Sequence, residues 1–429
     1  MGSDYDPGIC IVTQPAAHSL QRGLPRPSPE AIAHSARLQS AIEQEITAAG
    51  GWIPFSRYMQ LALYEPGLGY YSAGATKFGD DGDFVTAPMI SPLFSRVCAR
   101  QIGSLLRTSG TSEVLEFGPG TGDFAAEALT LLGAEGSPLT RYSMLEVSAD
   151  LRDRQQHKIR TGVDIAWLSR LPENFSGVIF ANEILDAMPC ERFVVRGGEW
   201  WRLGVGLRDA NSFEWRVRPA DGACADDEAF SLATEVRRKE ISDLGVELPE
   251  GYCGEWQVDL PAWFAAISAS LVEGAVLIAD YGLPRKQLLH PDRVGGSLRC
   301  HYRHRAHGDP FLLPGLCDIT AWVDFTSVAE AATTNGFDVS GFTTQASFLI
   351  GAGIEAAFHE ATAGLDPSDP QAISFARGLQ TLLLPGEMGE SVKFMLLSRK
   401  SKNPVVEESM NRQLETATAF SQRDLRDSL

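Results

Sequence analysis

The sequence predicts an α/β protein built on a parallel sheet that is covered by helices on both faces. From Glu113 to about Leu185, short runs rich in apolar and β-branched residues alternate with helical segments, and such alternation indicates βαβ units. A glycine-rich turn, GPGTG, follows the first of these runs directly. A further apolar run, GAVLIADYG over residues 274–282, is typical of a later strand in the same sheet.

The residues before the sheet predict a loose arm followed by helices. Residues 1–27 are rich in Pro and Ser and show no periodicity. A helix is expected to begin at Ser28, a suitable N-cap before Pro29, and to end at Gly50 and Gly51. Two more helical patterns cover residues 53–63 and the residues after Ser91.

Residues 67–88, which lie between these two helical patterns, are dense in Gly, Asp and aromatic residues. The segment is too long for an ordinary connection, so it is a candidate lid over a bound ligand. An ordered surface loop packed by its own aromatic rings is the alternative. The residues singled out are Tyr70, Tyr71, Phe78, Asp80, Asp81, Asp83 and Thr86.

Within the sheet region we expect strands and helices to alternate. In chain order they are EVLEFG, the helix DFAAEALTLLG, RYSMLEVS, the helix ADLRDRQQHKIR, VDIAWL and GVIFANEIL. A hairpin is expected to turn at Gly197 and Gly198. Two late strands, FDVSGFTTQASFLI and SVKFMLLSRK, flank a helix near residues 371–384, and a polar, mobile tail follows. The predicted segments are 1–27 (arm), 28–108 (helices and lid), 109–192 (first half of the sheet domain), 193–265 (insertion), 266–402 (second half with substrate-side elements) and 403–429 (tail).

Composition restricts the partners of the protein. The 429 residues include 55 acidic and 37 basic ones, which gives a formal net charge of −18. This charge disfavours nucleic acids and anionic membrane surfaces and favours a cationic substrate. The seven cysteines include no CxxC pair, so neither a disulfide framework nor a zinc site is expected. Because the N-terminus shows no secretory or transit pattern, we expect a cytoplasmic location by default.

The glycine turn predicts a nucleoside-type cofactor. Gly118, Gly120 and Gly122 lie between a strand and a helix, where backbone N–H groups and a helix N-terminus face a ligand. Glu146 ends the second strand, where an acidic residue binds ribose hydroxyls in doubly wound folds. The GxGxG spacing differs from the GxGxxG of dinucleotide-binding sheets. The alternative is a tight βα turn with an exposed carboxylate at Glu146.

These residues resemble a known family. EFGPGTG, together with the LE of YSMLEVS, resembles motif I and the following acidic residue of class I S-adenosylmethionine-dependent methyltransferases. Further stretches resemble the MidA-like family, whose mitochondrial members are complex I assembly factors that symmetrically dimethylate an arginine of a core subunit. These stretches are GYYS, FGDDGDFVTAP, NEILDAMP, IADYG, RCHYRHRAHGDPFLLPG and DITAWVDF. The resemblance covers roughly residues 51–400.

The resemblance implies a Rossmann-like, seven-stranded methyltransferase sheet that binds S-adenosyl-L-methionine. The methionine end would lie over Gly118 to Gly122, the ribose on Glu146 and the adenine near Trp167 and Leu168. Glu116 and Asn182 complete the expected cofactor contacts. The implied partner is a protein that presents an arginine, with a complex I subunit as the candidate. The sequence has Met89 where the family usually has Glu and Trp322 where it usually has His, and we assign no role to position 89.

The run NEILDAMP is the candidate catalytic segment. Methyl transfer from a sulfonium is an in-line displacement, so positioning is the main task. An arginine arrives protonated, and paired carboxylates can accept it bidentately and bias its charge away from the attacking nitrogen. Asn182, Glu183 and Asp186 follow the fourth strand at its carboxyl end, and one helical turn would place both acids on a single face. A helix N-cap cluster is the alternative.

The segment CHYRHRAH supplies a candidate proton acceptor. His301, His304 and His307 are spaced like metal ligands, but no acidic ligand accompanies them, and Arg303 and Arg305 would repel a cation. We therefore expect no metal. We expect the segment to line the substrate channel, with His301 able to take the proton released on transfer, and the DYG run at 280–282 to face the same cleft.

Three functions remain open from the sequence. The first is a protein-arginine methyltransferase, the second a methyltransferase that acts on a small molecule, and the third a non-catalytic assembly chaperone with a vestigial cofactor site. The fold and the cofactor turn are compatible with all three, because neither dictates the methyl acceptor.

Overall fold

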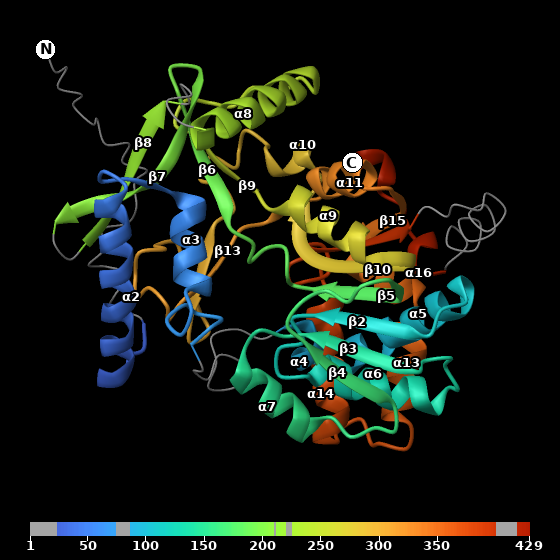
Figure 1. Cartoon of the computed structure of the whole chain (residues 1–429). Coiled ribbons are helices and arrows are strands. Elements are labelled where there is room, and N and C mark those ends of the chain that lie inside the picture. Colours follow the sequence, from blue (N-terminus) through green and yellow to red (C-terminus); the bar gives the residue numbers. More distant parts are fainter. Residues whose placement is uncertain (1–23, 74–85, 210–211, 220–224, 400–417) are drawn as a thin grey trace, which may run out of the picture. The chain divides into compact units, whose positions relative to one another are not determined.

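The structure, a computed structural model, describes residues 24–73, 86–209, 212–219, 225–399 and 418–429. The chain divides into two compact units (Figure 1). Unit 1 comprises Met1–Phe84, Asp186–Asp259 and Pro284–Asp324, and unit 2 comprises Val85–Leu185, Leu260–Leu283 and Phe325–Leu429. None of the helices in these described ranges combines the length and apolarity that a membrane crossing requires.

Unit 2 contains the predicted α/β sheet, which the structure confirms. Its strands follow the order β15-β16-β10-β5-β2-β3-β4. All neighbours pair in parallel except β16, which is antiparallel to both β10 and β15. The strands are β2 (Glu113–Phe117), β3 (Arg141–Leu145), β4 (Asp164–Leu168), β5 (Phe175–Asn182), β10 (Leu271–Leu283), β15 (Phe337–Thr344) and β16 (Val392–Arg399).

The central strands are apolar because both faces of the sheet are buried. In β5, Val178 and Phe180 belong to one core cluster with residues of α5 and α6, and the intervening Ile179 is equally buried on the other face. The rings of Phe124 and Phe180 stack with centroids 4.3 Å apart.

The helices of unit 2 are α4 (Ala87–Ile90), α5 (Pro92–Ser109), α6 (Asp123–Ala134), α7 (Ala149–Lys158), α9 (Leu260–Ser270), α11 (Phe325–Thr334), α12 (Gln345–Gly351), α13 (Ile354–Thr362), α14 (Pro370–Leu383) and α16 (Thr418–Ser421), followed by the 3₁₀ turn η1 (Arg426–Ser428).

The strand order reverses at β2, which places a binding edge in the sheet. The chain runs from β2 to β3 and β4 on one side and then returns to β5 on the other side of β2 (Figure 1). In open α/β sheets, ligands bind outside the carboxyl ends of the strands at such a switch point. The glycine turn after β2 and the run NEIL after β5 both lie at this point.

Unit 1 combines four described helices with an antiparallel sheet of order β1-β7-β6-β9, to which β8 adds through β7, and a small antiparallel sheet of order β12-β11-β13. As predicted, a hairpin turns at Gly197 and Gly198, whose φ angles of 59° and 77° suit the turn. The described strands of unit 1 are β1 (Ile53–Pro54), β6 (Cys190–Arg196), β7 (Glu199–Asp209), β8 (Ser212–Pro219), β9 (Cys253–Gln257), β11 (Arg299–Tyr302), β12 (Arg305–His307), β13 (Asp318–Thr320) and β14 (Val323–Asp324). Its helices are α2 (Pro29–Ala48), α3 (Phe55–Tyr64), α8 (Ala225–Asp243) and α10 (Arg285–Leu288).

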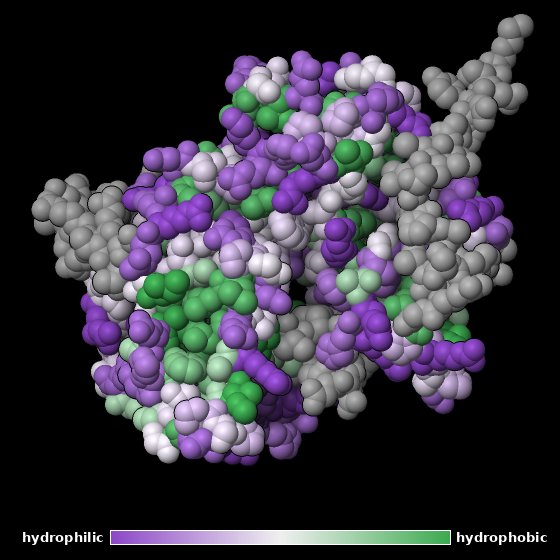
Figure 2. Space-filling model, turned by 180° about the vertical axis from the view of Figure 1, so that it is seen from behind, coloured by the Kyte–Doolittle hydropathy of each residue, from purple (hydrophilic) through white to green (hydrophobic). Residues whose placement is uncertain are grey.

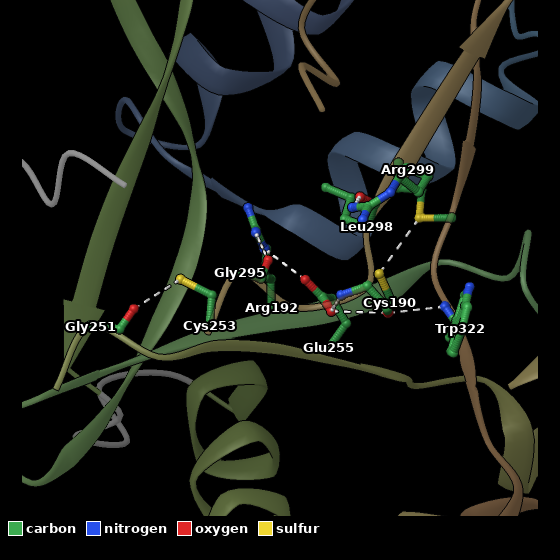
Figure 3. Close-up of polar contacts among 11 residues, drawn as sticks. Cys190, Arg192, Gly251, Cys253, Glu255, Gly295, Leu298, Arg299 and Trp322 are labelled. Atoms are coloured by element: carbon green, nitrogen blue, oxygen red, sulfur yellow. Dashed lines mark hydrogen bonds and ion pairs between the residues drawn. The ribbon is translucent and has the colours of Figure 1, made fainter. Parts of the chain in front are cut away.

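A buried ion pair joins β6 and β9, and its two side chains also hydrogen-bond to the segment before β11 (Figure 3). Arg192 Nε donates to Glu255 Oε1 over 3.0 Å, and the second carboxylate oxygen accepts from Ser297 N at 2.9 Å. Ser297 Oγ in turn accepts from Trp322 N at 3.0 Å. The Trp322 ring lies 5.0 Å below the guanidinium carbon of Arg293, so the residue that replaces the family's usual His packs against a cation.

Two predicted segments differ from the structure. The expected strand over residues 337–350 ends at Thr344, because the Thr344 hydroxyl accepts from Ser347 N at 3.3 Å and so caps the short helix α12. The expected mobile tail is packed where it is described: Phe420 is buried, its ring lies 5.3 Å from that of Phe348, and Leu425 N donates to Phe342 O at 2.8 Å.

Candidate functional site

The glycine turn requires glycine for its backbone shape. Gly118, Gly120 and Gly122 have φ angles of 53°, 54° and 80°, a region that side chains disfavour. A Cβ atom on Gly118 would lie 2.5 Å from Ile184 Cδ1. Gly122 is the N-cap of α6, so the first N–H groups of that helix open onto the turn. The turn therefore offers backbone donors to a ligand.

Glu146 is buried beside the turn and keeps room for further hydrogen bonds. Its side chain is 5% exposed; Oε1 accepts from Ser148 N at 2.8 Å and Oε2 accepts from Gln155 Nε2 at 3.3 Å. Burial raises the pKa of Glu146, and these hydrogen bonds oppose the rise. A carboxylate has about four acceptor positions, so positions remain for ribose hydroxyls. An exposed carboxylate, the alternative from the sequence, is not what the structure shows.

Trp167 and Leu168 lie at the carboxyl end of β4 and are joined to the end of β3. Trp167 Nε1 donates to Gln155 Oε1 at 2.9 Å, and Leu168 O accepts from Glu146 N at 3.2 Å. Arg152 of α7 donates to the carbonyl oxygens of both Glu146 and Leu168, at 2.7 and 3.1 Å. These contacts fix the two strand ends relative to each other.

Glu116, predicted as a cofactor contact, lies in β2 and is paired with a tyrosine. Tyr142 Oη donates to Glu116 Oε2 at 2.7 Å. Burial raises the pKa of Glu116 to about 8; the hydrogen bond from Tyr142 opposes this rise and the charge of Glu146 adds to it. The carboxyl group is therefore partly protonated near neutral pH in the folded chain.

Stability is expected to fall as pH rises because of Glu116. Its folded pKa of about 8 lies above the unfolded value of 4.5, so the folded state holds an extra proton between these values and loses stability across that window as pH increases. One unit of pKa difference corresponds to about 1.4 kcal/mol. Chemical denaturation of the wild type and of Glu116→Gln at about pH 5 and pH 8 measures the effect. The Gln variant should show a flatter dependence, and equal slopes would contradict this assignment.

The carboxyl end of β5 brings Asn182 and Glu183 together in unit 2. Glu183 has a φ angle of 53°, and its N–H donates to Ala279 O at 2.8 Å. Its Oε1 accepts from Ala87 N at 3.2 Å and from Asn182 Nδ2 at 3.4 Å. The left-handed backbone of a glutamate costs on the order of 1 kcal/mol or more, and such strain clusters at functional sites.

The expected helix after Glu183 is wrong. The N–H groups of Ile184 and Leu185 donate to Asp280 Oδ2 at 3.0 and 2.7 Å, and Tyr281 N donates to Oδ1 at 2.8 Å. Because the left-handed Glu183 precedes them and Asp280 takes their donors, residues 183–189 form a turn. Asp280 is fully buried and supports this turn.

Asp186 and His301, the other predicted catalytic residues, belong to unit 1. Asp186 is buried, and its carbonyl accepts from Ala321 N at 2.9 Å. His301 lies in the hairpin of β11 and β12 and is paired in register with Asp318 of β13. Burial lowers the pKa of His301, as do the nearby His307 and Arg299. A neutral imidazole can accept a proton.

Unit 1 also holds two tyrosines beside these acids. Tyr71 Oη donates to Asp318 Oδ1 at 2.9 Å, and its ring stacks on Tyr64 with centroids 5.5 Å apart. Burial raises the pKa of Tyr64, and the charges of Asp318 and Asp186 add to the rise. In the described parts of the chain, no group of three His, Cys, Asp or Glu residues could hold a metal ion.

The predicted lid is only partly visible. Phe78, Asp80, Asp81 and Asp83 lie outside the described residues. Tyr70 packs edge-on against Tyr71, with ring centroids 5.0 Å apart. Thr86 is the N-cap residue of α4, the short helix that contains Met89.

Sequence reasoning missed Gln155 and Arg152. Both lie on α7, whose sequence is mostly polar. The available signal was spacing: Leu151 and Gln155 are four residues apart, and they are the buried residues of this helix, so they share one helix face.

A separate cavity of about 440 Å³ lies between α4 and α14 of unit 2. Its described lining includes Ile90, Ile373 and Arg377 but none of the predicted site residues. Ile350 and Leu384 are also exposed on α12 and just after α14. The rear view shows areas of apolar residues among polar ones (Figure 2).

Comparisons with known proteins agree with this geometry. The model of a family described as "Putative S-adenosyl-L-methionine-dependent methyltransferase" matches residues 93–343. A crystal structure of a COG1565 superfamily member from Burkholderia thailandensis bound to S-adenosyl-homocysteine is similar, with 42% identity, a TM-score of 0.83, and coverage of 95% of this chain and 100% of that one.

Curated relatives are named protein arginine methyltransferases. The mitochondrial NDUFAF7 homolog of Drosophila melanogaster is 27% identical, covering 89% of this chain and 92% of its own. Mitochondrial NDUFAF7 of Homo sapiens is 26% identical, covering 81% of this chain and 80% of its own.

These relatives also correct one prediction. The cytoplasmic location expected from the sequence is contradicted, because the curated relatives are mitochondrial proteins. That expectation rested only on a missing targeting pattern.

The family match covers more than half of the chain, and it confirms the cofactor class expected from the glycine turn. The chain belongs to this family of S-adenosyl-L-methionine-dependent methyltransferases.

Proposed function

We propose that the protein transfers a methyl group from S-adenosyl-L-methionine to a guanidinium nitrogen of an arginine on a partner protein. The observation that carries this is Glu183, held in a left-handed conformation at the switch point of the sheet. Its neighbour Ile184 lies against Gly118 of the cofactor turn, so the carboxylate and the turn share one edge of unit 2. The curated relatives named protein arginine methyltransferases support the acceptor.

The residues of unit 2 fit the cofactor, which supplies the methyl group when bound. Three of the five residues of the glycine turn carry no side chain, and Glu146 keeps acceptor positions for ribose hydroxyls. Trp167 and Leu168 end the adjacent strand and would border the adenine. The proposed cofactor contacts are Glu116, Gly118, Gly120, Gly122, Glu146, Trp167, Leu168 and Asn182.

Glu183 is proposed to bind the substrate guanidinium. A carboxylate accepts two parallel N–H donors from an arginine, which orients the third nitrogen and draws positive charge away from it. Asp186 is proposed as the second acid and His301 as the acceptor of the released proton, since its lowered pKa keeps the imidazole neutral. A complex I subunit is the proposed partner, on the basis of the family resemblance.

Replacing Glu183 by glutamine tests the acceptor. The amide keeps an oxygen for Ala87 N, so we expect the variant to fold and to bind S-adenosyl-homocysteine within about threefold of the wild type. Loss of the charge should reduce arginine methylation at least about 100-fold. The measurement is transfer of labelled methyl to a complex I subunit preparation, followed by mapping of the labelled residue.

Glu355→Gln on α13, an exposed glutamate, is the matched control and should methylate normally. Undiminished arginine labelling by Glu183→Gln would refute the role of Glu183. Label that accumulates only in a small molecule would favour a methyltransferase that acts on small molecules. No label on any acceptor would favour a non-catalytic assembly chaperone.

A further inference from the structure

Gln155 contacts three parts of the proposed cofactor site: the glycine turn, Glu146 and Trp167. It lies on α7 and is fully buried. Its Nε2 donates to Gly120 O at 2.7 Å and to Glu146 Oε2 at 3.3 Å, and its Oε1 accepts from Trp167 Nε1 at 2.9 Å. Gly120 and Glu146 follow β2 and β3, and Trp167 lies at the carboxyl end of β4.

We propose that Gln155 is a positioning residue for the cofactor, whose single amide holds the glycine turn, the ribose carboxylate and the indole at the adenine end in one arrangement. The orientation of this amide is fixed by its partners. Gly120 O can only accept and Trp167 Nε1 can only donate, so the nitrogen must face the turn and the oxygen must face the indole. Every polar atom of the amide is therefore used.

The aliphatic part of Gln155 also contacts the turn. A Cβ atom on Gly122 would lie 3.2 Å from Gln155 Cγ, so the third glycine leaves room for this side chain. A residue that served only to fill the core would be apolar, because burying an amide without partners costs free energy. Here the partners are the groups that the cofactor would meet, which is the pattern of a residue that preorganises a site.

Gln155 also acts on the charge of Glu146. Its N–H favours the ionised carboxylate, against the effect of burial on the Glu146 pKa. The other charged groups that face Glu146 among the described residues are Arg152 of α7, which favours ionisation, and Glu116 of β2, which interacts unfavourably with it. Removing the amide should therefore make Glu146 protonate at higher pH.

The inference rests on the proposed cofactor site, so the test begins with the wild type. Isothermal titration of the full chain with S-adenosyl-homocysteine is carried out at several pH values, from neutral down to the lowest pH at which thermal unfolding shows that the chain is folded. The wild type should bind more weakly as pH falls, because Glu146 becomes protonated. Absence of binding by a folded wild type would overturn the cofactor site itself, and this inference with it.

Gln155→Met keeps the length of the side chain and removes its donors and acceptor. We expect binding to weaken by at least about tenfold, the effect of one lost hydrogen bond to a charged group, with the weakening on acidification beginning at higher pH. Gln156→Met is the matched control, since Gln156 is the exposed neighbour, and should bind like the wild type. A folded Gln155→Met variant with wild-type affinity would overturn the positioning role.

Gln155→Glu decides the question even if the Met variant fails to fold. The new carboxylate would face Gly120 O and the Glu146 carboxylate, and two facing carboxylates share a proton. When the new carboxyl group is protonated, it can donate to Glu146 again, so binding by this variant should first tighten as pH falls and then weaken once Glu146 itself is protonated. A folded variant whose affinity only falls on acidification, as in the wild type, would overturn the inference.

Discussion

Valine in place of Gly118 is expected to lower the affinity for S-adenosyl-homocysteine at least about 100-fold, because a β-branched residue at positive φ is a strained outlier. The φ angle at this position is 53°, and the first side-chain atom would lie 2.5 Å from Ile184 Cδ1. The backbone must therefore move, and the N–H groups of the turn move with it. Titration calorimetry measures the loss.

Two further glycine variants are controls for this loss of affinity. Gly118→Ala should lose less, because the end of the flexible Ile184 side chain can turn away from a single methyl group. Gly162→Val should bind normally, since nothing lies within 4 Å of a Cβ atom there. Wild-type affinity in a folded Gly118→Val variant would show that the turn does not contact the cofactor.

Leucine in place of Glu255 is expected to destabilise the chain by about 3–5 kcal/mol, because it leaves a buried guanidinium without its counter-ion. The side chains of Arg192 and Glu255 are 8% and 2% exposed. The substitution also removes the acceptor of Ser297 N. Urea denaturation measures the free energy of unfolding.

The double variant Arg192→Met/Glu255→Leu is the control for this charge effect. It removes both ions and should be more stable than Glu255→Leu alone, although less stable than the wild type because Gly295 O and Ser297 N lose partners. A double variant that costs the full sum of its two single variants would contradict a coupled pair.

Local pattern was enough to predict the sheet and the cofactor turn. Strands such as β2 and β5 are buried on both faces and appear as apolar runs, and the positive φ of Gly118, Gly120 and Gly122 explains why glycine recurs there. The helix start at Ser28 was also local, because its side chain accepts from Ala31 N at 3.2 Å.

Other features depend on residues far away in the sequence. The turn after Glu183 exists because Asp280, 95 residues beyond Leu185, accepts its N–H groups, and no pattern within NEILDAMP reveals that acceptor. Gln155 is one amide in a polar helix until the sheet places Gly120 and Trp167 beside it. The assignment of Asp186 and His301 to unit 1 is likewise a property of the whole fold.

Calorimetric titration of the wild type and of Glu146→Ala with S-adenosyl-homocysteine is the most direct test of the proposed cofactor site. We expect binding in the range of about 1–100 μM by the wild type, which is about −8.2 to −5.5 kcal/mol, and loss of binding in the variant, which lacks the ribose carboxylate. Thermal unfolding of both proteins shows that they are folded. A folded wild type that binds no ligand, or a folded variant that binds as tightly as the wild type, would contradict the proposed site.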